Sequence, residues 1–401
     1  MLSGSAVVKS HILEPIKSPV TSFQNLFSML YQNVKKIVVD PKPKVYDNIP
    51  PLYEGEPMDL ANFNKKLDKK VGKDIYKGSI KYLINGDDFF GDFITETENS
   101  KESVDVRLYI FDTDDYAVRV ADILKAKSNN DKKVKVKVLI DGIANITEGM
   151  EKPDLPMDKN FKSPTSIKAY LRKGSKVKVK TSSNTWFIFD HSKMIVIDNK
   201  IAYVGGMNIG QEYRYSWHDM MMRLEGPVTS AVQKEFNKAW ASASMAGDLG
   251  KLFAVVFNTA KHTEEEKAEY QDKLKDMVDI RLLFTKANRP EIYKAQMLAI
   301  KNAKKYIYIE NPYLADYRII TALIEARQRG VDVRVILPSK NNVGMMVSSN
   351  AIVTNLFLKN GIRVFSYPGM THIKAAIYDG WASVGSANFD NLSLAINKEF
   401  N

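Results

Sequence analysis

The chain has 401 residues, 44% of them hydrophobic and 26% charged, which is enough apolar material for a large core or for two lobes. Its 58 lysines and arginines outnumber its 47 aspartates and glutamates, so the net charge of +11 favours anionic partners, either nucleic acid or an acidic lipid surface. The lack of cysteine excludes disulfides and thiolate metal sites. No apolar run approaches the roughly 18 residues of a membrane-spanning helix.

Residues 1–52 are predicted to form an N-terminal arm with one amphipathic helix and a linker. Large apolar side chains recur there at the spacing of one helical face: Phe23, Leu26, Phe27, Leu30, Tyr31, Val34 and Val38. The pattern favours a helix packed on the body of the protein, and the alternative is a helix that lies in a membrane interface. Proline-containing stretches then indicate a linker that ends near residue 52.

Two segments beyond the arm repeat one strand–helix–strand pattern. The first runs from "VDVRLYIFD" at 104–112 to "VKVKVLID", and the second runs from "KKYIYIENP" at 304–312 to "VDVRVILP". Each unit predicts two parallel strands joined by a right-handed crossover. We therefore expect an α/β protein of two homologous lobes related by a pseudo-twofold axis, at 53–260 and 261–401, each a mixed and mostly parallel sheet flanked by helices. A charged helical stretch, "TEEEKAEYQDKLKDM", is predicted to connect them.

The same short motif occurs once in each lobe. "DHSKMIVID" and "THIKAAIYD" both read His-x-Lys, four residues, then Asp. The residues are His191, Lys193 and Asp198 in the first copy, and His372, Lys374 and Asp379 in the second. Turn residues after each aspartate predict a hairpin of two short strands. Because residues two apart in a strand share a face, each histidine should emerge beside its lysine. The two aspartates lie at the turns, which predicts a structural role.

Further polar residues follow each motif at matching offsets. Asn208 ends "GGMN" and Asn388 ends "GSAN". Eleven residues later come Asp219 and Glu399. An acid at the same offset in both copies predicts one carboxylate behind each imidazole, with Asp219 serving His191.

This set of residues suits the chemistry of phosphate diesters. One neutral imidazole attacks phosphorus and forms a phosphohistidine, while the other, protonated, gives its proton to the leaving alcohol. The lysines and asparagines would surround the phosphoryl oxygens, with Asn208 and Asn388 as substrate-binding residues. The acids would hold each imidazole in one tautomer. No metal is required, and the sequence predicts no carboxylate cluster to hold one.

At these residues the sequence resembles the phospholipase D superfamily, whose signature is His-x-Lys-x4-Asp. Within the superfamily it is most similar to bacterial cardiolipin synthases, through "INGDDFF", "VGGMNIGQEY", "IENPYL" and "VGSANFDNLSLAINKEFN", and the likeness covers residues 84–401. The resemblance implies a monomer with both motifs at one site and no cofactor. It also implies that His191 is the nucleophile and His372 the acid.

The resemblance leads to several functional expectations. It favours transfer or hydrolysis at phospholipid headgroups, by a phospholipase D or cardiolipin synthase-like enzyme whose partner is an anionic phospholipid or a membrane surface. The alternatives are an endonuclease of the same superfamily, for which a basic chain would suit nucleic acid, and a non-catalytic lipid-binding module. We expect a peripheral membrane protein or one of the bacterial cell envelope. The second lobe ends two residues after Glu399, which predicts a shortened C-terminal lobe.

Overall fold

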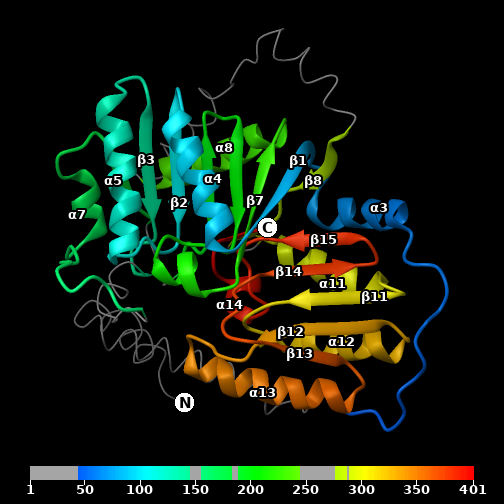
Figure 1. The fold of residues 1–401 in the computed structure, drawn as a ribbon. Coiled ribbons are helices and arrows are strands. Elements are labelled where there is room, and N and C mark those ends of the chain that lie inside the picture. The colour runs from blue at the N-terminus through cyan, green and yellow to red at the C-terminus, as the bar shows by residue number, and fades with distance from the viewer. Residues whose placement is uncertain (1–43, 145–154, 183–187, 244–275, 287–288) are drawn as a thin grey trace, which may run out of the picture.

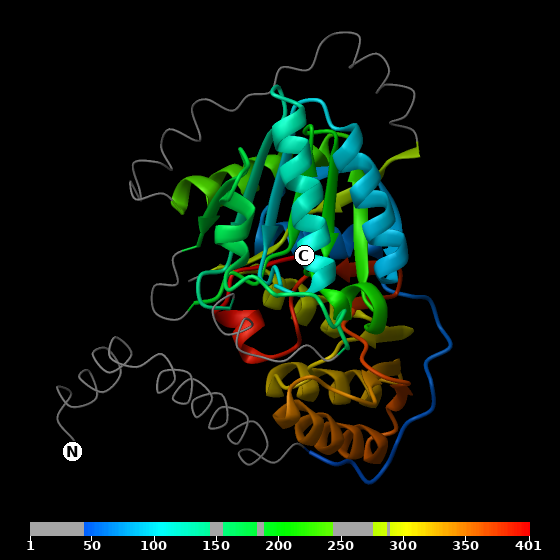
Figure 2. The ribbon, with the colours of Figure 1, turned by 60° about the vertical axis from the view of Figure 1, so that its left-hand side comes forward.

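A computed structural model of the chain describes residues 44–144, 155–182, 188–243, 276–286 and 289–401. The helix expected at residues 23–38 lies outside the described residues, as does nearly all of the charged connector. The described chain forms two lobes, one above the other in Figures 1 and 2, and the C-terminal residue lies between them. In these described residues no helix combines the length and the apolar character needed to cross a membrane.

The first lobe is built on an eight-stranded mixed sheet in the order β4-β3-β2-β5-β6-β7-β1-β8. The strands are β1 (Ile75–Ile84), β2 (Ser103–Leu108), β3 (Lys135–Ile140), β4 (Lys178–Thr181), β5 (Met194–Ile197), β6 (Ile201–Gly205), β7 (Met220–Glu225) and β8 (Val278–Arg281). The central strand β5, "MIVI", is buried along its whole length. A strand covered on both faces reads as a continuous apolar run, as this one does.

Helices cover both faces of the first sheet. Three of them, α4 (Asn85–Asn99), α5 (Asp115–Asn130) and α7 (Ile167–Arg172), pack with the sheet in one apolar core. On the opposite face, α8 (Val228–Ser242) packs through Val228, Val232 and Phe236. A short π-helix, Glu212–Ser216, precedes β7.

The second lobe has a five-stranded sheet in the order β13-β12-β11-β14-β15. Its strands are β11 (Tyr306–Glu310), β12 (Asp332–Pro338), β13 (Arg363–Tyr367), β14 (Ala375–Tyr378) and β15 (Trp381–Val384). Its helices are α11 (Glu291–Asn302), α12 (Tyr317–Gln328), α13 (Gly344–Lys359) and α14 (Asn391–Ala395). A small sheet of β9 (Phe284–Lys286), β10 (Arg289–Pro290) and β16 (Glu399–Phe400) completes the lobe.

The predicted repeat is confirmed in the strand pairing. β2 pairs in parallel with β3 across α5, and β11 pairs in parallel with β12 across α12. Each crossover helix begins at an aspartate cap: Asp114 accepts from the backbone N–H of Ala117, and Asp316 accepts from those of Arg318 and Ile319. The fold is the expected pair of α/β lobes.

The lobes exchange short segments at their border. Helix α3 (Leu60–Val71), which the expected boundary at residue 53 assigned to the first lobe, buries Phe63 and Leu67 in the core of the second lobe. Strand β8 follows the expected boundary at residue 261 but pairs with β1 in the first sheet. Periodicity shows that a helix has an apolar face, whereas the element that covers this face is set by the tertiary fold.

Both predicted hairpins are present, and they position the histidines. β5 pairs with β6 and β14 pairs with β15, in each case antiparallel. His191 and His372 lie just before β5 and β14 rather than within them. Because β5 and β14 run antiparallel to β2 and β11, their first residues lie opposite the carboxyl ends of those strands. Each His-x-Lys segment therefore emerges at the edge of its sheet where functional groups of α/β folds collect.

Candidate active site

Backbone hydrogen bonds hold each His-x-Lys segment against the other lobe. The N–H of His191 donates to the carbonyl of Lys398 at 2.9 Å. The N–H of His372 donates to the carbonyl of His218 at 2.7 Å, and the N–H of His218 donates to the carbonyl of Met370 at 2.9 Å. His191 thus pairs with the residue before Glu399, and His372 pairs with the residue before Asp219.

The acids consequently cross between the lobes. His191 Nδ1 lies 2.9 Å from Glu399 Oε2, and His372 Nδ1 lies 2.7 Å from Asp219 Oδ2. The expectation that Asp219 serves His191 is wrong. Equal spacing of the motifs showed that each lobe supplies one histidine and one acid, but the partner choice depends on how the lobes face one another.

The glycine of each Gly-x-x-Asn segment makes this arrangement possible. A Cβ atom on Gly205 would lie 2.3 Å from the carbonyl oxygen of Met220, and one on Gly385 would lie 2.4 Å from that of Phe400. Met220 and Phe400 directly follow Asp219 and Glu399 in the chain. Only glycine therefore lets the segment that carries each acid approach so closely.

The two lysines are buried beside the imidazoles. Lys193 and Lys374 are 0% and 3% exposed, and each ammonium donates to the carbonyl of the histidine two residues before it. Burial lowers the pKa of Lys193 to about 8 and that of Lys374 to about 7, although Asp219 and Glu399 favour the charged forms. Buried cations of this kind gain strongly from an anion placed between them.

Burial also shifts the pKa values of both histidines and of Asp219. It lowers the pKa of His191, and nearby Lys193 and Lys374 add to this, opposed by Glu399. Burial and the same two lysines lower the pKa of His372 well below its ordinary value. Burial raises the pKa of Asp219 to about 7, against the attraction of Lys374 and Lys193. The lowered pKa values favour the neutral form of both imidazoles before substrate binds.

The two asparagines differ in their surroundings. Asn208 is 1% exposed; its carbonyl oxygen accepts from the N–H of Ile110 at 3.0 Å and its amide donates to the Tyr213 hydroxyl at 2.8 Å. Asn388 is also buried, and within the described residues its Oδ1 has no hydrogen-bond partner. Asn208 thus holds its loop in place by hydrogen bonds, whereas the Oδ1 of Asn388 has no hydrogen-bond partner within the described residues.

Asp198 and Asp379 occupy equivalent turns, each with a positive φ, at 52° and 47°. The carboxylate of Asp198 accepts from the N–H groups of residues 101, 102 and 103 at 2.6 to 2.7 Å. That of Asp379 accepts from Met58 and from residues 304, 305 and 306. The contacts are long-range, and they fasten each hairpin to the start of β2 or β11.

Several residues that sequence patterns did not indicate support the site. Arg107 and Asp190 form a buried ion pair at 2.7 Å directly before His191. The Ser386 hydroxyl donates to Glu399 Oε2 at 2.5 Å. The rings of Tyr109 and Trp217 lie 4.7 Å and 5.1 Å from His191 and His372. Among these residues, Arg107 and Tyr109 had a sequence signal, because they are two apart in "RLY" at the end of β2 and so share a face.

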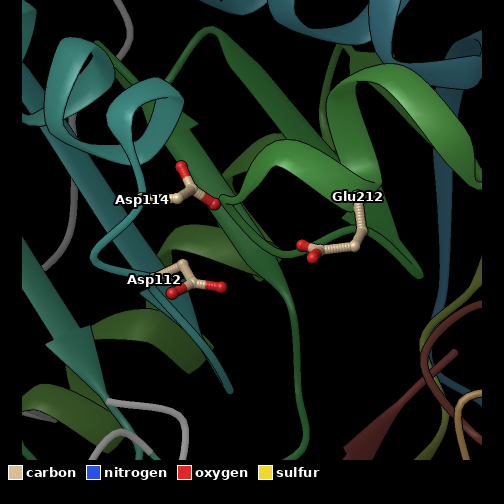
Figure 3. Close-up of side chains that lie close together, drawn as sticks. All are labelled: Asp112, Asp114 and Glu212. Carbon is tan, nitrogen blue, oxygen red and sulfur yellow. The ribbon is translucent and has the colours of Figure 1, made fainter. Parts of the chain in front are cut away.

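Three carboxylates also gather in the first lobe, contrary to expectation. Asp112, Asp114 and Glu212 place oxygen atoms within 4.8 Å of one another (Figure 3). Burial raises the pKa of Asp114 to about 7, and Asp112 and Glu212 add to this. Asp114 caps α5 and accepts from the N–H of Gln211 at 2.7 Å. Asp112 and Asp114 lie just before α5 and Glu212 begins the π-helix, so the three are far apart in the sequence, which did not indicate their proximity.

Comparison with known proteins matches the sequence to phospholipase D-like family models. The family model described as "Cardiolipin synthase, PLD-like domain" matches residues 93–240 and 297–401, which include both His-x-Lys segments and both acids. The chain belongs to the phospholipase D-like family. The two matched segments correspond to the two lobes, so each phospholipase D-like half contributes one histidine and one acid to a single site.

Relatives of the chain include bacterial cardiolipin synthases. The cardiolipin synthase of Listeria monocytogenes serotype 4a is 27% identical over 345 residues, and cardiolipin synthase A of Pseudomonas syringae is 28% identical over 333 residues. Each alignment covers 80% of this chain and 64% of the relative. The chain therefore spans less than two thirds of the length of these relatives. The crystal structure of phosphatidylserine synthase from Haemophilus influenzae superposes with a TM-score of 0.59 at 14% identity, covering 84% of this chain and 86% of that one.

Proposed function

We propose that the protein is a phosphatidyltransferase that exchanges the alcohol of a phospholipid headgroup through a covalent phosphohistidine. The observation that carries the proposal is the pair of crossed His–carboxylate contacts, with two buried lysines beside them. The relatives named cardiolipin synthase and phosphatidylserine synthase support a phospholipid substrate rather than nucleic acid.

In the first half-reaction, His191 acts as the nucleophile. Its Nδ1–H donates to Glu399, which leaves Nε2 with a lone pair to attack phosphorus. The phosphorus–oxygen bond to the leaving alcohol breaks, and that oxygen takes a proton from His372. His372 Nδ1 faces Asp219, so Nε2 is the atom that delivers the proton.

In the second half-reaction, the same groups act in reverse. His372 removes a proton from the acceptor, either an alcohol or water. The acceptor oxygen attacks phosphorus, the phosphorus–nitrogen bond breaks, and His191 returns to its neutral form. The choice of acceptor decides between transfer and hydrolysis.

The negative charge of the substrate sets the protonation states of the lysines and of His372 that the two half-reactions need. A phosphodiester anion between Lys193 and Lys374 would raise the pKa of both lysines and of His372. The lysines would then stabilise the charge that builds on the phosphoryl oxygens. Asp219 and Glu399 orient the rings and stabilise the imidazolium forms.

Membrane association, a single-chain catalytic unit and independence of metal belong to the same proposal. One chain supplies both histidines, both lysines and both acids, which supports a monomeric unit. None of the proposed steps needs a metal. A peripheral membrane or cell-envelope location follows from a phospholipid substrate.

The test is incubation with phosphatidylglycerol and, in parallel, with single-stranded and double-stranded DNA, all in chelator. Cardiolipin or phosphatidic acid among the lipid products supports the proposal. Cleaved DNA with unchanged lipid would assign the chain to the nucleases of the family, and a His191→Ala control shows that any product depends on this site.

A further inference from the structure

Helix α13 lies at the end of the second lobe that faces away from the first lobe (Figures 1 and 2). Its sequence, "GMMVSSNAIVTNLFLK", has 16 residues, and its last residue, a lysine, is the single charged one. Three of its large apolar side chains are about half exposed: Val347 at 48%, Ile352 at 46% and Leu358 at 53%. The helical period places these three on one side of the helix.

The side of α13 that faces the core is, in contrast, partly polar. Ser349 and Asn350 are buried there. The amide of Asn350 donates to the carbonyl of Pro312 at 2.8 Å, and its Oδ1 accepts from the N–H of Leu314 at 3.4 Å. A surface helix usually turns its polar and charged residues toward water. An exposed apolar side without charges on such a helix therefore indicates a partner surface.

The segment that precedes α3 extends this apolar surface past the end of the helix. The N–H of Tyr46 donates to Oδ1 of Asn360, which caps α13, at 3.2 Å. Ile49 packs over Gly361, where an added Cβ would lie 2.6 Å from Ile49 Cγ2. Val45 and Ile49 are 47% and 42% exposed. We call the resulting surface the outer face; it consists of Val45, Ile49, Val347, Ile352 and Leu358.

Lysines flank the outer face at both ends. Lys340 lies four residues before the start of α13, Lys359 is its last residue, and Lys44 directly precedes Val45; all three lysines are exposed. Long lysine side chains can keep their charge in the headgroup region while their methylene groups contact apolar surface. An uncharged apolar face with cations at its edges is therefore suited to the interface of an anionic bilayer.

The N-terminal end of α13 is tied to the loop that leads to His372. The N–H of Lys340 donates to the carbonyl of Gly369 at 3.2 Å, and the N–H of Gly369 donates to Ser339 Oγ at 2.8 Å. Gly369 precedes His372 by three residues. A surface that binds α13 would consequently be held near the segment that carries the proposed acid.

We propose that the outer face binds the surface of an anionic lipid bilayer. The proposal rests on the proposed function, because a phospholipid substrate is supplied from such a surface. Val347, Ile352 and Leu358 would enter the boundary between headgroups and acyl chains, and the flanking lysines would contact lipid phosphates. These lysines favour a bilayer over a second copy of the chain, since two copies packed through this face would bring like charges together.

The lack of cysteine in the chain allows a site-specific probe of this contact. In the full chain, Val347→Cys, Ile352→Cys and Leu358→Cys are each labelled with nitrobenzoxadiazole, a fluorophore whose emission rises in apolar surroundings. Vesicles of phosphatidylglycerol and phosphatidylcholine in equal parts should raise the emission about twofold or more at all three positions. Val278→Cys, a position 50% exposed on β8 in the first lobe, is the matched control and should not respond.

A second measurement connects vesicle binding to turnover. The triple variant Val347→Asn, Ile352→Asn, Leu358→Asn should bind these vesicles about tenfold more weakly or worse. Lys340→Glu should weaken binding about fivefold, and only where the vesicles contain phosphatidylglycerol. For the triple variant, the ratio of turnover on vesicles to turnover on monomeric dihexanoyl phosphatidylglycerol should also fall about tenfold, because the monomeric lipid requires no membrane contact. Val278→Asn should keep the wild-type ratio.

Each contrary outcome has a separate meaning. Emission that is unchanged by vesicles would overturn the proposal. If that emission is already high at every protein concentration, another segment of the chain covers the outer face, and if it rises with protein concentration alone, a second copy does. Vesicle binding that survives in the triple variant would overturn the proposal too.

The docking surface and the proposed function can fail separately. Wild-type protein that binds vesicles through α13 but turns over neither lipid would overturn the proposed function and leave the docking surface standing. Turnover of both lipids without a response of the three probes would do the reverse. Thermal unfolding shows which variants fold, and the cysteine probes test the outer face even where the triple variant does not fold.

Discussion

His191 and Glu399 are separated by 208 residues, and their Nδ1 and Oε2 atoms lie 2.9 Å apart. The matching contact joins His372 to Asp219 in the opposite direction, at 2.7 Å. Neither lobe therefore contains a complete histidine–acid pair. Because each lobe supplies the acid for the other, separation of the lobes would disable both imidazoles together.

The crossed pairing makes a prediction about the acids. Glu399→Gln and Asp219→Asn should each leave the fold intact and reduce turnover by a factor on the order of a hundred or more, because the imidazole loses its orientation. In an NMR titration of the histidine rings, Glu399→Gln should change the pKa of His191 and Asp219→Asn that of His372, because each acid contacts only that ring. Coupling of Asp219 to His191 instead would contradict the structure.

The nucleophile can be identified with a substrate that carries a good leaving group. His372→Ala should still release that group once and retain the phosphatidyl group on His191, because a weakly basic leaving group needs no proton. His191→Ala should release nothing and carry no label. Peptide mapping after the single turnover gives the labelled residue. A label on His372 in the His191→Ala protein would reverse the two roles.

The pH dependence of kcat/KM follows from the free-enzyme pKa values. The rate should rise with pH as His191 loses its proton, at a pH below the ordinary histidine value because its pKa is lowered. It should fall as Lys374 and Lys193, with pKa values of about 7 and about 8, lose the charges that bind phosphate. Steady-state rates between about pH 5 and pH 9 check this bell shape. A rate that stays constant at alkaline pH would show that the lysines remain charged.

Asp198→Asn should lower the stability of the fold and leave the catalytic rate of the folded protein unchanged. Its carboxylate accepts from three backbone N–H groups at the start of β2, and the amide loses the charge and one acceptor. We expect a loss of about 1–3 kcal/mol in the free energy of unfolding, measured by denaturant titration. The folded fraction should keep its kcat. Asp131→Asn, at the C-terminus of α5, is the control and should change little.

Removal of divalent metal should leave the activity unchanged. The proposed steps use only imidazoles, lysines and carboxylates, so chelator at millimolar excess should not alter turnover. Asp112→Asn, in the group of three carboxylates of the first lobe, should likewise retain metal-free activity. Restoration of a chelated enzyme by one added cation would contradict this mechanism.

The sequence by itself determined the repeat and the chemistry that the repeat carries. Strand patterns at 104–112 and 304–312 predicted the parallel units because apolar alternation is a local property of the chain. The two His-x-Lys motifs and the matching acids were visible for the same reason. Their recurrence at equal offsets indicated one site built from two similar halves.

Only the tertiary structure decided which partner each residue meets. The pairing of Glu399 with His191 depends on the relative placement of two sheets, and sequence spacing within one lobe carries no information about it. The same holds for α3, whose apolar face packs in the second lobe, and for the Arg107–Asp190 ion pair. Nothing in the sequence around His218 indicates a partner, yet the approach of Glu310 from the other lobe places a carboxylate oxygen 3.7 Å from its Nε2. Contacts between distant segments arise from the packing of whole elements, so they were absent from every local pattern.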